Sequence, residues 1–245
     1  MKIVTWNCNG ALRNKFQFID ELKADIYVIQ ECENPSVVKH DGYKQWSSNY
    51  LWIGDSKNKG LGVFAKGSTV LKKLDWNNNF SGHVDNSIPE HKVKHFLACS
   101  VNNEFNLLGV WTHKNDSECF GYIGQLWKYL QLNQKKLGDC IIAGDLNSNV
   151  VWDKWDRWWN HSNVVEGLKK DGIESLYHLV NNELQGKETT PTLYLQRKLE
   201  KPYHIDYIFG SEKWTSSITS CKVGKPSKWL VVSDHMPIIA DFRDE

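Results

Sequence analysis

Short apolar runs alternate with polar stretches along the whole chain, and many of these runs have the composition of buried strands. Such strands are rich in Val, Ile and aromatic residues and are bounded by Gly, Asn or Asp. This pattern predicts strands over nine segments: Lys2–Trp6, Asp25–Gln30, Tyr50–Ile53, Leu61–Ala65, His95–Val101, Phe105–Thr112, Cys140–Ala143, Ile205–Phe209 and Pro237–Phe242. The third and fourth, and the fifth and sixth, are separated by short polar turns, which indicates two hairpins.

Other segments carry apolar residues at the three- and four-residue spacing of a helix, as Phe16, Ile19 and Leu22 do. Helices are therefore predicted over Arg13–Leu22, Gly121–Lys136, Val164–Lys170 and Ile173–Val180, with an N-cap for the third within His161-Ser162-Asn163. Strands outnumber helices, and both hairpin and helix-crossover connections occur. The pattern therefore favours a layered α+β fold.

Composition narrows the class of protein. The chain has 245 residues and no linker-like stretch, so one domain over residues 1–245 is predicted. The formal net charge of +1 argues against a non-specific polyanion binder but permits a local basic rim or a bound metal. No apolar stretch is long enough for a membrane span, and no signal peptide is recognisable, so a cytoplasmic protein without a membrane partner is expected. Six cysteines without zinc-site spacing predict buried free thiols.

Polar residues that can carry chemistry lie at the ends of several predicted strands. They are Asn7, Glu31, His113, Asp145, Asn147, Asp206, Asp234 and His235. Carboxylates supply the hard oxygen ligands that suit Mg²⁺, and a histidine beside carboxylates is the usual general base at neutral pH. Singly, each residue is also compatible with a turn or a solvated surface. Asp206, between two apolar residues, is costly unless it is paired or faces outward.

Five segments carry a family resemblance when they are read together and in order. They are Thr5-Trp6-Asn7-Cys8-Asn9-Gly10, Val28-Ile29-Gln30-Glu31, Gly144-Asp145-Leu146-Asn147, Ile205-Asp206-Tyr207-Ile208 and Ser233-Asp234-His235-Met236-Pro237. With them the sequence resembles the endonuclease/exonuclease/phosphatase superfamily, which includes exonuclease III-type enzymes and pancreatic deoxyribonuclease. The resemblance implies a four-layer α/β/β/α sandwich of two mixed β-sheets with outer helices and an active site at one edge.

The resemblance also implies roles for individual residues. Glu31 would be the main ligand of Mg²⁺, for which Mn²⁺ can substitute, with Asn7 and Asp234 near the same ion and Asn9 supporting them at the edge of the substrate site. His235, oriented by Asp206, would be the general base or a phosphate contact. Asp145 would position or deprotonate the attacking water, and Asn147 would hold that water or a phosphate oxygen.

One departure from the family pattern concerns His113. Exonuclease III-type enzymes carry a tyrosine in this region, whereas a histidine resembles the deoxyribonuclease and lipid-phosphodiesterase branches, where it stabilises phosphate or protonates the leaving oxygen. This departure puts abasic-site specificity in doubt. The match is loose by a residue, so Asn115 is a second candidate, and a capping role for His113 stays open.

Three further residues are candidates for substrate contacts. Trp152 opens a segment, 152–159, in which tryptophans alternate with charged residues; such rings stack on bases or pack a loop. Arg197 belongs to a basic cluster that either contacts phosphate or forms a solvated turn. His204 stands where family nucleases often carry arginine, so it is either a phosphate contact or a strand neighbour.

The function expected from these residues is Mg²⁺-dependent hydrolysis of a phosphodiester by an endo- or exonuclease that acts on DNA more than RNA. Two alternatives remain. A phosphatase or phosphodiesterase for a small molecule or lipid headgroup is compatible with the near-neutral charge and with His113, since one fold hosts several chemistries. A catalytically inactive nucleic-acid-binding module is disfavoured, because the ligand and histidine positions are all filled.

Overall fold

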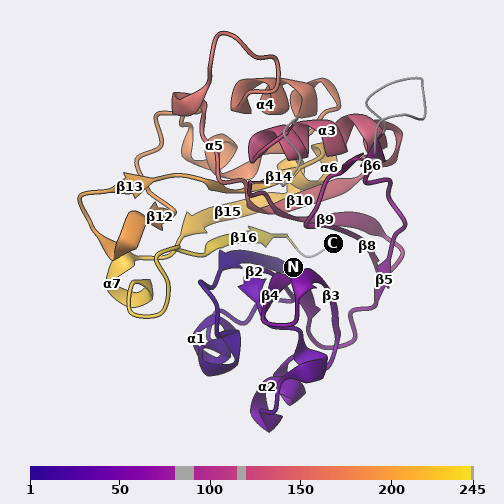
Figure 1. The fold of residues 1–245 in the computed structure, drawn as a ribbon, viewed down its shortest axis with the longest axis vertical. Helices are drawn as coiled ribbons and strands as arrows, with labels where there is room; N and C mark the ends of the chain where they lie inside the picture. Colours follow the sequence, from indigo (N-terminus) through magenta and orange to yellow (C-terminus); the bar gives the residue numbers. More distant parts are fainter. Residues whose placement is uncertain (81–90, 115–119, 244–245) are drawn as a thin grey trace.

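The computed structural model describes residues 1–80, 91–114 and 120–243 and consists of two six-stranded sheets packed face to face (Figure 1). The first sheet has the order β15 (Ile218–Val223), β16 (Ile238–Phe242), β1 (Lys2–Asn7), β2 (Ile26–Cys32), β4 (Lys59–Ala65), β3 (Tyr50–Ser56). The second has the order β11 (Glu174–Ser175), β14 (Asp206–Gly210), β10 (Cys140–Asp145), β9 (Phe105–Trp111), β8 (Phe96–Val101), β5 (Leu71–Lys73).

Helices form the two outer layers (Figure 1). The first sheet is covered by α1 (Phe16–Asp20), α2 (Asp41–Trp46) and α7 (Pro226–Trp229), and the second by α3 (Ile123–Asn133) and α4 (His161–Lys170). Beside β14 and β15 lie α5 (Leu176–Asn181) and α6 (Glu212–Ser217). Two small two-stranded sheets stand apart from the two large ones: β6 (Asn79–Phe80) with β7 (His91–Lys92), and β12 (Leu193–Tyr194) with β13 (Pro202–Tyr203). The predicted four-layer α/β/β/α sandwich is confirmed.

The central strands are apolar on both sides because both of their faces are covered. In β1, Ile3 packs into the core between the two sheets, whereas Val4 and Trp6 pack under the helices of the first sheet. The same alternation in β2 sends Val28 inward and Tyr27 outward. Strands buried on both faces are read from sequence as continuous apolar runs, which explains why these two were predicted.

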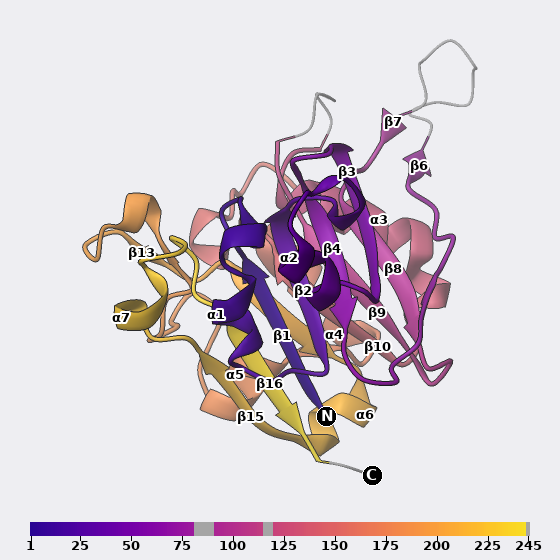
Figure 2. The same ribbon diagram turned by 90° about the horizontal axis from the view of Figure 1, so that it is seen from below.

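Each sheet contains one central parallel pair, and this arrangement creates the functional edge. β1 runs parallel to β2, as Figure 2 shows, and β9 runs parallel to β10. The antiparallel partners β14 and β16 begin where those strands end, so Asp145 at the end of β10 is paired with Asp206 at the start of β14. Strand ends that are distant in sequence therefore meet at one edge of the sandwich.

Several predicted boundaries are wrong in informative ways. The predicted helix 13–22 is a 3₁₀ turn followed by the short α1, and the segment predicted as helix 173–180 begins with the edge strand β11. The N-cap of α4 is Asn160, which forms a capping box with Asn163. Strands at sheet edges, such as β5 and β15, were not predicted, because edge strands bury too little surface to show a clear apolar pattern. That residues 1–245 form one domain stays a prediction.

The five cysteines within the described residues are buried free thiols, in agreement with the sequence, and Cys119 lies outside those residues. No helix in the described part of the chain has the length and apolar character needed to cross a bilayer. The predicted cytoplasmic location stays a prediction.

Candidate active site

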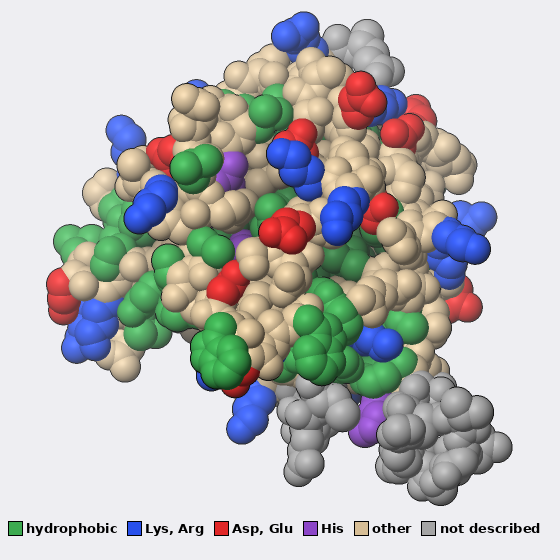
Figure 3. Space-filling view, turned by 90° about the horizontal axis from the view of Figure 1, so that it is seen from above, with side chains coloured by type: hydrophobic (Ala, Val, Ile, Leu, Met, Phe, Trp, Pro, Cys, Tyr) green, Lys and Arg blue, Asp and Glu red, His purple; other side chains and the backbone are tan. Residues whose placement is uncertain are grey.

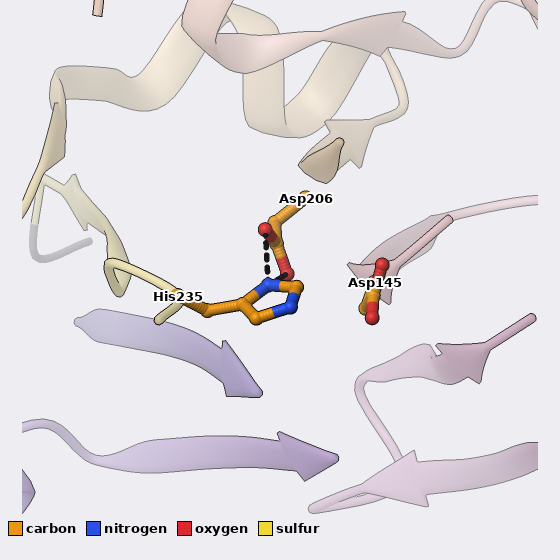
Figure 4. A group of neighbouring side chains, drawn as sticks. All are labelled: Asp145, Asp206 and His235. Atoms are coloured by element: carbon orange, nitrogen blue, oxygen red, sulfur yellow. Dashed lines mark hydrogen bonds and ion pairs between the residues drawn. The ribbon is translucent and has the colours of Figure 1, made fainter. Parts of the chain in front are cut away.

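A buried histidine–aspartate pair lies at the centre of the functional edge (Figure 4). Asp206 accepts a hydrogen bond from Nδ1 of His235, with 2.9 Å between Nδ1 and Oδ2, and both side chains are almost completely buried. Burial alone lowers the pKa of the imidazole, but the charge of Asp206 and its hydrogen bond outweigh burial and raise the pKa of His235 above its usual value. Asp206 is therefore buried and paired, and the pairing offsets the free-energy cost of burying a charged side chain in a strand.

Asp145 stands across from the ring of His235, whose second nitrogen is turned towards it (Figure 4). Burial and the nearby charge of Asp206 raise the pKa of Asp145 above that of a free aspartate, although His235 and the amide of Asn7 oppose the shift. Two carboxylates held this close share a site in which one of them readily takes up a proton. The arrangement thus combines a cationic histidine with a carboxylate able to accept a proton.

The carboxylate of Asp145 is fixed by three donated hydrogen bonds. The backbone N–H of Asn147 donates to Oδ1 (2.8 Å), and the side-chain amides of Asn7 and Asn147 donate to Oδ2 (2.9 and 3.0 Å). Gly144 allows this strand end to form, because a Cβ at that position would stand 1.8 Å from the carbonyl oxygen of Val110. The Gly-Asp-Leu-Asn segment is therefore a tightly packed strand end and not merely a polar turn.

Asn7 links Asp145 to Glu31. Its amide nitrogen also lies 3.4 Å from Oε1 of Glu31, and its Oδ1 accepts a hydrogen bond from the backbone N–H of Asn9. Asn9 in turn donates to Asp234 over 2.8 Å. The residues predicted to surround the metal are thus joined in one chain of contacts.

Backbone geometry turns three of these side chains towards the edge. Asn9, Glu31 and Asn147 all have a positive φ, of 52°, 60° and 44° respectively. For Glu31 this conformation coincides with a bulge, where the register between β2 and β4 shifts. Glu31 is therefore the second-last residue of β2, whereas the sequence predicted that it follows the strand. Such strained residues persist where the surrounding structure over-determines them, which is common at functional sites.

His113 follows β9 and is held by a second histidine that the sequence did not single out. Nδ1 of His113 donates to the carbonyl oxygen of Lys114 (2.8 Å), and Nε2 contacts Nδ1 of His95. His95 is buried, and burial together with the neighbouring His113 lowers its pKa to about 4. A neutral His95 leaves Nδ1–H free to donate to His113. In the sequence, His95 is recognisable only as a histidine that begins the predicted strand before the one that leads to His113.

Two hydroxyl residues also position the site and were missed. Ser233 donates to the carbonyl oxygen of Asn7 (2.8 Å) and accepts from the backbone N–H of His235 (3.0 Å). Thr192 accepts hydrogen bonds from the backbone N–H groups of Ile205 and Asp206. Ser233 lies within a segment that carries the family resemblance, so it could have been found, whereas Thr192 stands in a loop without a recognisable signal.

The predicted substrate-contacting residues are dispersed. Trp152 is 42 % exposed and packs against Tyr203, with ring centroids 5.3 Å apart. Arg197 is exposed and reaches the carbonyl oxygen of Val231, whereas His204 is buried and its Nδ1 donates to Thr190 (2.8 Å). Asn115 lies outside the described residues. The roles assigned to all of these residues stay predictions.

The donor set fits a hard divalent cation. Oε2 of Glu31 already holds a cation, the ammonium of Lys59, at 2.7 Å. Within residues 1–80, 91–114 and 120–243, Asp145, Asp206 and His235 also form a group whose potential ligand atoms all lie within 4.8 Å of one another. Because Asp206 and His235 satisfy each other and Asp145 already accepts three hydrogen bonds, the carboxylate of Glu31 is the donor best suited to Mg²⁺. That Asn7 and Asp234 lie beside the same ion stays a prediction. Oxygen ligands of this kind match the predicted cofactor.

Comparisons with known proteins show the family to which the chain belongs. The model of the Endonuclease/Exonuclease/phosphatase family matches residues 4–235. The chain belongs to this family. Its members are typically metal-dependent phosphoesterases, and the cluster of Asp145, Asp206 and His235 is the candidate centre for that chemistry. A search of curated proteins found no match.

Several solved structures share the fold at low sequence identity. A variant of the 3′ phosphatase NExo from Neisseria, bound to a product DNA hairpin, is 19 % identical with a TM-score of 0.69 over 100 % of both chains. An AP endonuclease from Archaeoglobus fulgidus is 18 % identical with a TM-score of 0.67, also over 100 % of both chains. The AP endonuclease LMAP from Leishmania major is 14 % identical with a TM-score of 0.65, over 100 % of this chain and 88 % of that one.

Proposed function

We propose that this family member is a Mg²⁺-dependent phosphodiesterase that hydrolyses nucleic acid, DNA more than RNA. The observation that carries the proposal is the buried His235–Asp206 pair facing Asp145, beside Asn7 and Glu31 at one sheet edge. The DNA hairpin in the related NExo structure supports DNA as the polymer. Whether the enzyme cuts within or at the end of a strand depends on how the substrate lies along this edge.

The residues divide the work of hydrolysis between them. Asp145, fixed by Asn7 and Asn147, holds the attacking water and accepts its proton, for which its raised pKa is suited. His235, kept cationic by Asp206, donates a hydrogen bond to the phosphoryl oxygen on which charge develops. His113, positioned by His95 and by the carbonyl oxygen of Lys114, lies at the end of β9 beside the same edge. A bound Mg²⁺ would polarise the phosphate and offset charge on the leaving oxygen.

A substrate panel tests this proposal. Single-stranded, duplex and abasic DNA, RNA and small phosphoesters are incubated with Mg²⁺, Mn²⁺ or EDTA. We expect turnover of DNA with either metal, none with EDTA, and a loss of about 100- to 10,000-fold in Asp145→Asn and His235→Ala while both variants remain folded. Asp139→Asn, at an exposed position just before β10 and thus at the opposite end of that strand from Asp145, is the matched control and keeps the wild-type rate. Wild-type rates in either site variant would refute the assigned roles.

A small phosphoester or lipid headgroup is the second candidate substrate, favoured by the formal net charge of +1 and by His113. The salt dependence of binding distinguishes this candidate from a nucleic-acid substrate. Binding of a polyanion weakens steeply as salt increases, because Lys and Arg release counterions from phosphate, whereas binding of a small substrate changes little. A flat salt response combined with preference for the small substrate would favour the second candidate.

A further inference from the structure

The segment that follows the Asp145 strand displays three tryptophans to solvent. Trp152, Trp155 and Trp158 are 42, 98 and 69 % exposed, whereas six of the other nine tryptophans of the chain are buried. Figure 3, which views the molecule from the side of α4, shows large hydrophobic side chains standing among charged ones on this face. Burying a ring of this size would stabilise the fold by about 2 kcal/mol or more, so several exposed tryptophans in one segment indicate an interaction site.

Looseness of the segment does not explain the exposure. The buried side chain of Asn160 accepts hydrogen bonds from the backbone N–H of Lys154 (3.0 Å) and from Nε of Arg157 (2.7 Å). It also donates to the carbonyl oxygens of Lys154 and Arg157 (2.7 and 2.9 Å). At the other side, Asp153 accepts from the first two backbone N–H groups of α4. The two most exposed rings are therefore carried on a backbone that is fixed at both ends.

The segment is physically continuous with the candidate active site. It is preceded by Asn149, four residues after Asp145. The amide of Asn149 donates to the carbonyl oxygen of His204 (2.9 Å) and to the hydroxyl of Tyr207 (3.1 Å). Tyr207 directly follows Asp206, and Trp152 packs against Tyr203, three residues before Asp206. A polymer held at the catalytic edge thus has the tryptophan segment as a neighbouring surface.

Charged side chains alternate with these rings. Lys154 and Arg157 stand between the tryptophans, and the guanidinium of Arg157 lies 4.3 Å from the ring centroid of Trp159. Aromatic side chains interleaved with cationic ones are typical of sites that bind single-stranded nucleic acid. Bases stack on the aromatic rings, and Lys and Arg contact the phosphates. A surface that enters a membrane needs a contiguous apolar face, which Lys154, Asp156 and Arg157 interrupt.

We propose that Trp155 and Trp158 form a stacking platform for unpaired bases of the nucleic-acid substrate. This inference rests on the proposed function and narrows it, since it assigns a single-stranded or frayed segment to the side of the site near α4. The platform recognises bases by their faces, so it confers little sequence preference.

Matched oligonucleotides test the platform without turnover. Binding of a fluorescently labelled 12-nucleotide thymidine strand is compared, in EDTA, with that of a strand of equal length whose nucleotides lack bases. The wild-type protein is expected to bind the base-bearing strand about tenfold or more tightly than the base-free strand, as stacking on one or two rings would give. The double variant Trp155→Leu, Trp158→Leu loses this preference but binds the base-free strand as before.

Two further variants separate stacking from general hydrophobic contact. Replacing both tryptophans by tyrosine keeps aromatic faces and retains most of the preference. Val70→Ala, at an exposed position near the opposite end of the second sheet, retains all of it. Hydrolysis of bis(p-nitrophenyl) phosphate with Mg²⁺ serves as the activity control, and the leucine variant keeps the wild-type rate on this substrate.

Equal binding of the two strands by the wild-type protein, or an undiminished preference in the leucine variant, would overturn the platform. Partition of the wild-type protein onto phosphatidylcholine–phosphatidylserine vesicles in preference to either strand, retained in the leucine variant, would instead identify a lipid contact and also overturn it. If no phosphodiester is cleaved but the base preference and its loss are observed, the proposed hydrolysis fails while the platform stands.

Discussion

Two regions with buried histidines, one with His235 and one with His161 and His204, lie on either side of β14, and the comparison shows what sets the charge of each ring. His235, before β16, contacts Asp206 and is driven towards the charged form. His161 and His204 pack around the ring of Tyr207, with centroids 5.0 and 5.1 Å away, and burial lowers the pKa of both. All three rings are similarly inaccessible. A carboxylate in contact, and not the degree of burial, therefore decides which histidine carries charge.

The two regions also treat their acidic side chains differently. Burial by itself raises the pKa of Glu188, but hydrogen bonds with His178 and the backbone N–H of Gly186 hold it at about 2, and it therefore stays ionised. Asp145 also accepts several hydrogen bonds, yet burial beside Asp206 raises its pKa. The cluster around Glu188 is satisfied internally and serves packing. The cluster around Asp145 keeps two carboxylates close together, an arrangement suited to proton transfer.

The largest effect is expected from removing the charge that distinguishes His235. Asp206→Asn preserves size but removes the charge that contributes most against burial of the ring, so the pKa of His235 should fall and turnover should drop by about 100- to 10,000-fold. NMR titration of the ring protons and steady-state kinetics measure the two changes. His161→Asn is the matched change in the other cluster and should leave turnover near wild type. If the pKa of His235 is unchanged in Asp206→Asn, the conclusion that Asp206 sets the charge of this histidine is wrong.

A smaller effect, on stability, is expected in the second cluster. The pKa of His161 is lowered to about 4 in the folded state, against about 6.5 when unfolded, so the unfolded state binds more protons between these values. The stabilising contribution is complete above pH 6.5 and is lost as the pH falls towards 4. Between pH 7.5 and 5 the loss from this residue is about 2 kcal/mol, which urea unfolding measures.

His161→Asn isolates that contribution. The variant is less stable at pH 7.5, because a buried ring is lost, but its stability should fall less between pH 7.5 and 5 than that of the wild type. Glu188 adds a further loss only below pH 4.5, as its folded pKa of about 2 is approached. Identical losses in wild type and variant over the upper range would show that His161 does not titrate as its burial requires.

The smallest effect concerns Glu31, whose partner is an exposed lysine and not a buried histidine. The ammonium of Lys59 competes with any divalent cation for the carboxylate, so Lys59→Met should bind Mg²⁺ several-fold more tightly, as measured by calorimetry. Stability should change by less than about 1 kcal/mol, because the lysine side chain is half exposed. Lys57→Met is the control and should leave the affinity unchanged. Weaker binding in Lys59→Met would mean that the lysine assists the metal.

The sequence alone determined the layered fold and the identity of the polar residues at its edge. Central strands such as β1 and β2 are apolar on both faces, so they can be predicted from their continuous apolar runs. The motifs around Asp145, Asp206 and His235 lie at the ends of other such strands, β10, β14 and β16. Each motif is local, and its residue types supply oxygen ligands for a metal and a histidine for proton transfer or phosphate contact.

Only the tertiary structure decided how these residues work. The charge of His235 depends on Asp206, 29 positions away, and the contact of His113 with His95 spans 18. The burial of His204 and the exposure of Trp155 depend on which elements pack against each residue, a property that residue type does not encode. Electrostatics and burial are set by neighbours in space, and the two sheets must close before those neighbours exist.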